Sequence, residues 1–244
     1  MKIKKKLTFQ QKLWQQASEF ADEVCLAKMD FLTQLGQRIM PDGVWGAKAC
    51  WLDRPEQLCL TFDDGPDPYT VPRLLELLEE EKVKATFFVV GSRVARQEKL
   101  VAKIAQAGHS IANHSYTHEF LPLLSVKRLE HEIISTNKLV YEISGTTPKL
   151  FRPPFGIMDQ RVADCLKEQG MSTVYWGAVP EDWLFPGSDR VVRRVMRRVN
   201  HGALIVLHEG RQIAQQTVAA AKEIIFRGKQ LGYEFVDVPD LITH

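Results

Sequence analysis

The sequence lacks most of the features that would place it in a specialised class of protein. Its four cysteines, Cys25, Cys50, Cys59 and Cys165, have no CxxC or other metal-ligand spacing and are too few for a disulfide framework in 244 residues, so buried free thiols are expected. No stretch has the eighteen or so uninterrupted apolar residues that a membrane-spanning helix needs. Lys plus Arg (32) nearly balance Asp plus Glu (30), which argues against a nucleic-acid binder or a membrane-surface protein.

An export signal is also missing from the start of the sequence. Residues 1–6 are basic, as in a signal peptide, but polar residues between positions 8 and 12 interrupt the apolar segment that should follow. We therefore expect a soluble, cytoplasmic protein that is not exported by the usual route. Its partner has to be identified from a site, because the composition indicates none.

Residues 8–40 predict one or two amphipathic helices. Apolar residues recur there at spacings of four and three, the period of one helix face, and Pro41 to Gly43 end the pattern. The repeat is too short for a coiled coil, so we expect this face to pack on the rest of the protein, with a dimer contact as the alternative. The chain then divides into an N-terminal helical extension, 1–50, and a main domain, 51–244. The apolar face consists of Leu13, Ala17, Phe20, Val24, Ala27, Phe31 and Leu35.

From residue 58 onward, strand-like runs alternate with segments long enough for helices. This alternation is typical of an α/β protein with a parallel sheet covered by helices. Seven repeats without a break favour a distorted, TIM-like (β/α)7 barrel, although periodicity alone leaves an open sheet as an alternative. The runs are 58–63, 84–90, 109–113, 149–152, 171–178, 203–208 and 233–237.

Charged and polar side chains, which are unusual in a protein core, lie at or just after the C-terminal ends of these predicted strands. In a parallel α/β barrel the C-terminal strand ends meet at one face, where such folds place their active sites. We therefore expect five polar groups to converge there. They are Asp63 with Asp64, His114 with His118, Arg152, Asp182 with Trp183, and His208.

The first predicted strand ends in two adjacent carboxylates. Consecutive side chains on a strand point to opposite faces, so Asp63 and Asp64 can share one site only where the pleat breaks. We expect Gly65 and Pro66 to break it. Buried carboxylates need a cation or hydrogen-bond donors, and the run therefore implies a partner elsewhere in the chain.

His114 and His118 are candidates for that partner. If the segment between them is helical, both imidazoles project from one side within reach of a single ion. Two histidines four residues apart are a weak signal alone. With a strand-end carboxylate they form a His, His, Asp set, which leaves a metal ion an open position for water.

Two further strand ends carry groups suited to acid–base chemistry. Arg152, stiffened by the two prolines after it, can hold a carboxylate in a fixed orientation, and a salt bridge that closes a loop is the structural alternative. Asp182 and His208 arrive from neighbouring strands. A carboxylate bonded to one ring nitrogen would raise the pKa of the imidazole and present the other nitrogen as a proton donor.

A basic cluster elsewhere carries no such pattern. Four arginines lie on a predicted helix whose other face is formed by valines, and this arrangement predicts a solvated basic surface, with a contact to an anionic polymer as the alternative. They are Arg193, Arg194, Arg197 and Arg198.

Five segments, in this order, resemble the motifs of the polysaccharide deacetylase family, which is carbohydrate esterase family 4 and includes nodulation-factor and chitin deacetylases. The segments are TFDDGP, HSYTH, RPPFG, EDW and LIVLH. The match covers residues 58–208, and the first two motifs are the most specific. The resemblance implies a metal-dependent hydrolase that removes N-acetyl groups from an N-acetylglucosamine-containing poly- or oligosaccharide, similar to chitin or peptidoglycan. The glycan substrates of this family are often located in cell walls, which conflicts with the missing export signal.

The resemblance also implies roles for individual residues. Asp63 is implied as the general base, Arg152 as its holder, and the backbone N–H of Phe155 as the donor to the oxyanion. His208 is implied as the general acid, with Asp182 as its partner. Asp64, His114 and His118 would bind a divalent metal ion, most readily zinc, with cobalt or another transition metal as alternatives, and Pro154, Trp183 and Val206 would line the substrate site.

Three positions depart from the family pattern. Phe155 stands where the family often has Tyr, which should matter little if only the backbone donates. Val179 stands where the family usually has a second Asp, which puts the support of Arg152 in question. Val206 stands where the family tends to have Leu, and it should leave the wall beside the acetyl methyl less filled.

Two other functions stay open on the sequence. An O-acetyl esterase acting on a xylan-like polymer would use the same residues. A catalytically silent carbohydrate-binding protein would keep the fold without turnover, and the complete set of base, ligands and acid argues against it.

Overall fold

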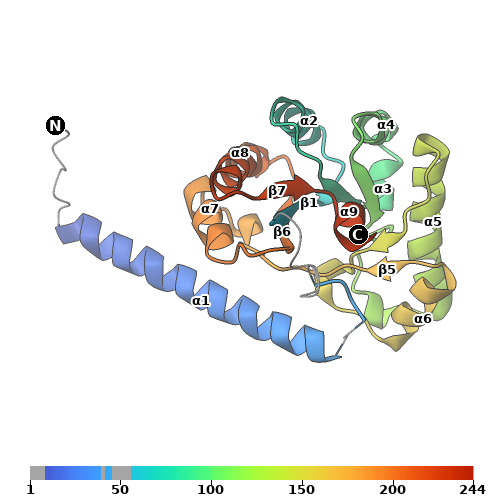
Figure 1. Ribbon diagram of the computed structural model, residues 1–244. Coiled ribbons are helices and arrows are strands. Elements are labelled where there is room, and N and C mark those ends of the chain that lie inside the picture. The colour runs from blue at the N-terminus through green and yellow to red at the C-terminus, as the bar shows by residue number, and fades with distance from the viewer. Residues whose placement is uncertain (1–8, 40–41, 46–55, 244) are drawn as a thin grey trace.

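The computed structural model describes residues 9–39, 42–45 and 56–243, and its centre is a sheet of seven parallel strands (Figure 1). The order along the sheet is β5, β4, β3, β2, β1 and β6, and β7 pairs with the first residues of β1. The predicted α/β class is confirmed. The strands are β1 (Gln57–Gly65), β2 (Thr86–Val89), β3 (Ser110–Asn113), β4 (Leu150–Phe151), β5 (Ser172–Thr173), β6 (Ala203–His208) and β7 (Glu234–Val236).

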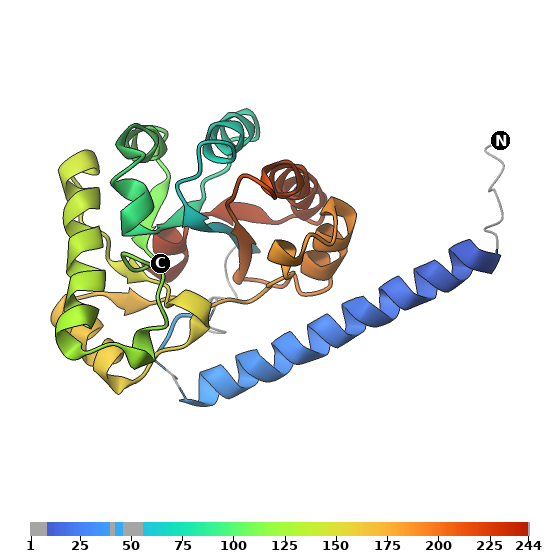
Figure 2. The ribbon, with the colours of Figure 1, turned by 180° about the vertical axis from the view of Figure 1, so that it is seen from behind.

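The sheet curls into a distorted barrel (Figures 1 and 2). β5 ends at Thr173, earlier than the predicted run 171–178, but the chain after it reaches the opposite edge of the sheet. There Ala178 pairs with Ile205 of β6 in a single parallel bridge, and the N–H of Gly177 donates to a β6 carbonyl. The predicted TIM-like barrel is therefore confirmed in an irregular form.

Helices follow the strands and cover the outside of the barrel, as the alternation predicts. The last helix packs differently, because Val238 and Leu241 lie among inward-facing residues of the sheet such as Cys59 and Phe88. The helices after α1 are α2 (Val71–Glu80), α3 (Gly91–Val94), α4 (Glu98–Gln106), α5 (Val126–Ser144), α6 (Gln160–Glu168), α7 (Ser188–Met196), α8 (Ala214–Gln230) and α9 (Val238–Thr243).

The alternation of side chains along β1 aims its functional end into the barrel. Leu58, Leu60 and Phe62 are fully buried in the apolar layer between the sheet and the helices. Cys59 belongs to the inner cluster, and Asp63 has the same parity along the strand. Asp63 therefore projects inward at the C-terminal end of β1, where the predicted site lies.

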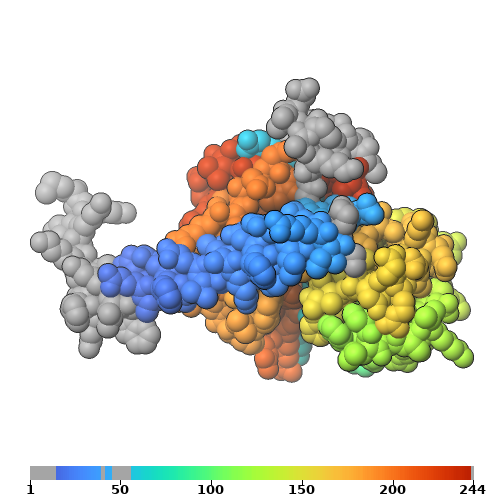
Figure 3. Space-filling view, turned by 90° about the horizontal axis from the view of Figure 1, so that it is seen from below, coloured from blue at the N-terminus to red at the C-terminus, as the bar shows by residue number. Residues whose placement is uncertain are grey.

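Helix α1 (Phe9–Ile39) is a single helix that lies below the barrel in the view of Figure 1 and crosses its underside in Figure 3. The predicted packing face is wrong. Phe20 and Phe31 of that face are 68% and 66% exposed, whereas Cys25 and Met29 are buried. A helical extension is present, but the side of it that packs is a different one.

Charged contacts explain this choice of face. Asp22 is almost fully buried, and its carboxylate receives hydrogen bonds from Arg194 at 2.8 Å and from Arg193 at 3.2 Å. Arg198 pairs with Asp30 at 2.8 Å. All three arginines hold α1 on the barrel. The prediction of a solvated basic surface is wrong for Arg194 and Arg198, whose side chains are largely buried, whereas Arg193 is exposed. Turning the outer apolar face inward would leave Asp22 without these partners.

Some expectations concern parts of the chain that the structure does not describe. The predicted boundary between residues 50 and 51 and the thiol of Cys50 lie in the stretch 46–55, outside the described residues. Cys25, Cys59 and Cys165 are buried free thiols, as predicted. Among the described helices, none combines the length and the apolar character that crossing a bilayer requires.

Candidate active site

Asp63 and Asp64 meet at one end of the barrel because the pairing of β1 with β2 is interrupted beside them by a β-bulge. Asp64 has a left-handed φ of 68°, so it leaves the alternation of the strand, and both carboxylates line one cavity. The break lies at Asp64 itself, one residue before the predicted Gly65 and Pro66. Gly65 serves another purpose, since a Cβ there would collide with the carboxylate of Glu209.

Asp64, His114 and His118 each bring one potential ligand atom to a common point, and these atoms lie within 4.8 Å of one another. The Nε2 atoms of His114 and His118 are 3.6 and 3.2 Å from Asp64 Oδ1. The segment between the histidines is a loop, not the helix considered above, and Ser115 and His118 have left-handed φ angles of 64° and 60°. Left-handed turns therefore bring the imidazoles together.

The protonation of these groups fits a metal site. His114 Nδ1 lies 2.6 Å from the carbonyl oxygen of Arg152, and because a carbonyl only accepts, Nδ1 carries the proton and Nε2 keeps its lone pair. Asp64 Oδ1 is buried without a hydrogen-bond partner. Burial raises the pKa of Asp64, but the imidazoles of His118 and His114 lower it below its usual range. A carboxylate and two imidazole nitrogens suit a divalent transition-metal ion such as zinc.

Two buried residues outside the motifs hold the histidine loop. Glu132 of α5 is fully buried, and its carboxylate accepts the N–H groups of Tyr116 and Thr117 at 2.8 and 2.7 Å. Asn113 at the end of β3 accepts the N–H of Ser115 at 2.8 Å. Our sequence reasoning missed both residues. Glu132 could have been found as a glutamate on the apolar face of a predicted amphipathic helix, where a charged residue needs a partner.

A buried ion pair fixes Asp63. Arg152, which follows β4, donates from Nη1 to Asp63 Oδ1 at 2.6 Å and to Thr61 Oγ1 at 2.8 Å. Its Nε and Nη2 both donate to the carbonyl of Tyr175, at 3.1 and 2.8 Å. Every nitrogen of the guanidinium therefore has a partner although position 179 carries valine. The concern about Val179 is answered, because strand β1 and the chain after β5 support Arg152.

His208 lies beside Asp63, because the two are register partners on the adjacent strands β6 and β1. His208 Nδ1 is 2.8 Å from Asp182 Oδ1, and the His208 backbone N–H donates to Oδ2 of the same carboxylate at 2.7 Å. Burial lowers the pKa of His208, but the Asp182 carboxylate more than compensates and raises it to about 9. The imidazole is therefore a cation at neutral pH that can donate a proton from Nε2.

A cavity of about 400 Å³ opens over these groups, which is large enough for part of a small ligand. Trp183 and Val206, which were assigned to the substrate site above, line it. Pro154 is buried and does not line it, whereas the preceding Pro153 does. The ring of Trp183 meets the imidazole of His208 edge-on, with 4.8 Å between centroids.

Phe155 lies at the rim of this cavity with a left-handed φ of 59°. It belongs to the 3-10 turn Pro154–Gly156, and the first N–H groups of such a turn have no partner within it. Its backbone N–H is thus available to a ligand. Its ring is 62% exposed and contacts the imidazole of His118, with 4.9 Å between centroids.

Glu209 is a further buried carboxyl that our sequence reasoning missed. It directly follows His208, and its Oε2 accepts the N–H of Asp67 at 2.9 Å. Burial raises its pKa to about 8. Glu209 packs under Gly65 and so orders the loop that follows the two aspartates.

The comparisons with known proteins agree with this geometry. The profile of the polysaccharide deacetylase family matches residues 53–174. The chain belongs to this family. It is 39% identical over 189 residues to a peptidoglycan-N-acetylglucosamine deacetylase of Bacillus cereus, a match that covers 77% of this chain and 88% of the relative. Membership, and with it the predicted class of enzyme, a polysaccharide deacetylase that hydrolyses amide bonds, is confirmed.

Solved structures of the family share the fold. A peptidoglycan N-acetylglucosamine deacetylase superposes with a TM-score of 0.76 at 30% identity, covering 82% of this chain and 92% of that one. A family 4 pseudoenzyme from Bacillus anthracis superposes with a TM-score of 0.72 at 28% identity, covering 77% of this chain and 66% of that one. The fold of a polysaccharide deacetylase therefore occurs in a protein described as a pseudoenzyme, and turnover has to be argued from the site residues.

Proposed function

We propose that this deacetylase removes N-acetyl groups from a glycan that contains N-acetylglucosamine, similar to peptidoglycan or chitin. One observation carries the proposal. Asp63, held by Arg152, and His208, held by Asp182, are register partners on adjacent strands, so a base and an acid stand side by side in one cavity. The Asp64, His114 and His118 cluster lies against them.

The ligand cluster would hold a divalent ion, with zinc as the best match to its donors. When bound there, such an ion polarises water and the amide carbonyl and so lowers the barrier to attack. The observation that supports this assignment is the buried Oδ1 of Asp64, which faces the Nε2 atoms of His114 and His118 at 3.6 and 3.2 Å without forming a well-aligned hydrogen bond.

The protein's own residues supply the proton transfers. Asp63 is the general base that takes a proton from the attacking water, and Arg152 holds its carboxylate in a fixed orientation. The N–H of Phe155 donates to the oxygen that becomes negatively charged as the carbonyl is attacked. His208 then gives its proton to the departing amine, and acetate and a free amino sugar result.

The test is acetate release from N-acetylated chitooligosaccharides and from peptidoglycan, with zinc, cobalt or a chelator present. Release that chelator abolishes and zinc or cobalt restores is the expected result. Release from acetylated xylan alone would show an O-acetyl esterase. No release from any of these polymers would make the protein a silent binder and would overturn the proposal.

A further inference from the structure

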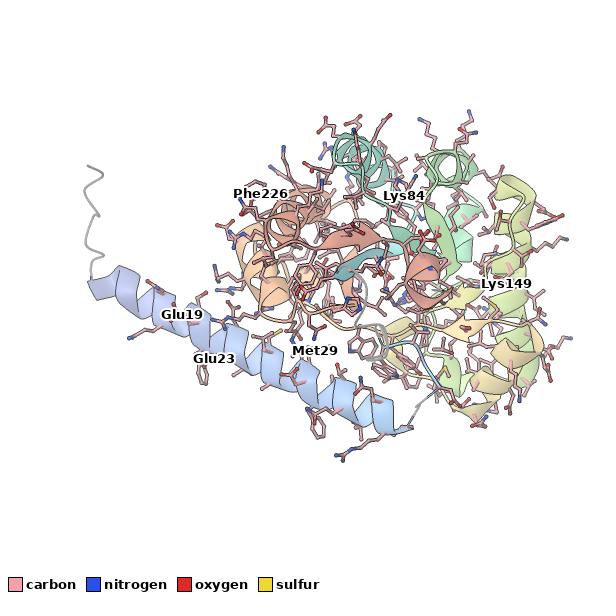
Figure 4. All side chains as sticks on the ribbon, in the orientation of Figure 1. Glu19, Glu23, Met29, Lys84, Lys149 and Phe226 are labelled. Atoms are coloured by element: carbon pink, nitrogen blue, oxygen red, sulfur yellow. The ribbon has the colours of Figure 1, made fainter. Side chains whose placement is uncertain are left out.

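Helix α1 contributes one wall of the catalytic cavity. Lys28, Met29 and Leu32 line the cavity together with Asp63 and His208. In Figure 4, Met29 lies on the side of α1 that faces the barrel. The family profile matches residues 53–174, so this wall comes from a segment outside the matched region.

Apolar contacts seat this wall on the strand that carries the acid. Cys25 and Met29 pack in one buried cluster with Val179 and Val206. Met29 is 6% exposed, and Val206, two residues before His208 on β6, is 3% exposed. Met29 therefore occupies the space beside a valine that is shorter than the leucine of the family pattern.

Polar contacts fix the same stretch of α1 on both sides of Met29. The ammonium of Lys28 pairs with Glu181, which also lies 3.7 Å from the guanidinium of Arg194. Trp176, another residue that lines the cavity, donates from Nε1 to Thr33 Oγ1 at 3.1 Å. The stretch of α1 around Met29 is thus held on each flank, and it cannot move away from β6 without breaking an ion pair or a hydrogen bond.

We propose that Met29 is a specificity-determining residue that closes the acyl end of the cavity beside Val206 and limits the acyl group that is removed to acetyl. The inference rests on the proposed N-deacetylase function. Met29 is a flexible, apolar side chain that fills irregular space, and an apolar wall discriminates by the size of what fits against it. Shortening this side chain should admit a longer acyl group.

The first experiment compares Met29→Ala with Met29→Leu in the full-length, metal-loaded protein. The substrates are chitotetraoses that carry N-acetyl or N-propionyl groups, and the readout is the ratio of kcat/KM for propionyl to that for acetyl. One methylene in an apolar pocket changes such a ratio by about 10-fold or more. We expect a rise of about this size for Met29→Ala and, for the volume-conserving Met29→Leu, a ratio within about 2-fold of the wild-type value.

Cys25→Ala is the matched control, since Cys25 packs in the same cluster but does not line the cavity. It should leave the ratio unchanged. An unchanged ratio in Met29→Ala with acetate release intact would overturn the inference and leave the proposed function standing. An equal rise in Cys25→Ala would also overturn it, because loosening of the helix would then be the cause.

A second experiment does not depend on turnover. The Lys28 side chain is 53% exposed at the cavity wall, so a bound glycan should shield it from an amine-reactive reagent. Exposed Lys149, on a distant part of the barrel in Figure 4, is the internal control. With Asp63→Asn protein saturated by chitotetraose, labelling of Lys28 should fall several-fold while that of Lys149 stays constant. Equal labelling of both with glycan bound would show that the substrate does not reach α1.

The two experiments separate the two claims. Protection of Lys28 in a protein that releases no acetate would reject the proposed function and keep α1 as a wall of the glycan site. Acetate release without protection of Lys28 would keep the function and reject the wall.

Discussion

The cavity has two walls of different construction. The strand-end wall takes its groups from β1, β4 and β6 and from the loop after β3, and buried hydrogen bonds fix them, as between Arg152 and Asp63. The helix wall is one face of α1, attached by ion pairs such as that of Asp22 with Arg194 and by a small apolar cluster. The catalytic groups and the contacts that attach α1 are therefore separate, and substitutions in one wall should leave the other intact.

The largest effect is expected in the strand-end wall. His208→Ala removes the proposed general acid and should lower kcat by about 10²-fold to 10⁴-fold, measured as acetate release at saturating chitooligosaccharide. Labelling of Lys28 by the amine reagent is the control and should not change, because His208 does not hold α1. Activity within 10-fold of the wild type would contradict the assignment of the acid.

Weakening the attachment of α1 to the barrel should leave the strand-end groups of the site intact. Asp22→Asn leaves Arg193 and Arg194 without their buried carboxylate, and removing one partner of such a group costs about 3–5 kcal/mol. Faster hydrogen exchange along α1 should follow, because its docking is weakened. Zinc affinity should stay within about 2-fold, since the described hydrogen bonds and ion pairs of α1 include none to Asp64, His114 or His118, and a large fall in it would contradict the separation of the walls.

A smaller effect tests how the metal site is supported. Glu132→Gln removes the charge that accepts the N–H groups of Tyr116 and Thr117, while it keeps the shape of the side chain. Loss of such a support lowers metal affinity by about 10-fold to 100-fold. Competition with a chromogenic chelator measures it. Unchanged zinc affinity would mean that the loop orders itself without Glu132.

The smallest change concerns pH. Burial lowers the pKa of His208 and Asp182 raises it to about 9, so Asp182→Asn should lower that pKa. Because an acid acts in its protonated form, the alkaline limb of kcat/KM should move to lower pH, by about one unit or more. The acidic limb is the internal reference. If both limbs keep their positions, His208 is not the group that titrates on the alkaline side.

Sequence reasoning predicted the strand-end wall well because its chemistry restricts the residue types. Ligands and proton carriers have to be Asp, His or a similar side chain, and the C-terminal strand ends of a parallel barrel converge, so Asp64, His114 and His208 could be placed together. The backbone conformation that brings these side chains together was harder to predict. A helix between the two histidines was considered as one way to bring them together, whereas left-handed Ser115 and His118 form a loop, and such turns leave no periodic signal.

The helix wall was mispredicted because apolar spacing does not reveal which face a tertiary contact selects. The regular stripe with Phe20 and Phe31 is exposed, and the packed face contains a buried aspartate that pattern reasoning assigns to solvent. The burial of this aspartate is explained by Arg193 and Arg194 of α7, which the sequence pattern assigns to a solvated surface. Glu132 and Glu209 were missed for a related reason: each acts through backbone N–H groups, which any sequence supplies.

The length of α1 has a mechanical consequence. Its 31 residues form a rod roughly 45 Å long at 1.5 Å per residue, and its far end projects beyond the barrel (Figure 1). The same rod carries Met29 at the cavity. A tether placed at the projecting end, whether a bead, a fused protein or a surface, would thus set the direction in which the mouth of the cavity faces, and a pull on it would load the contacts of Asp22 with Arg193 and Arg194 before it reached Met29.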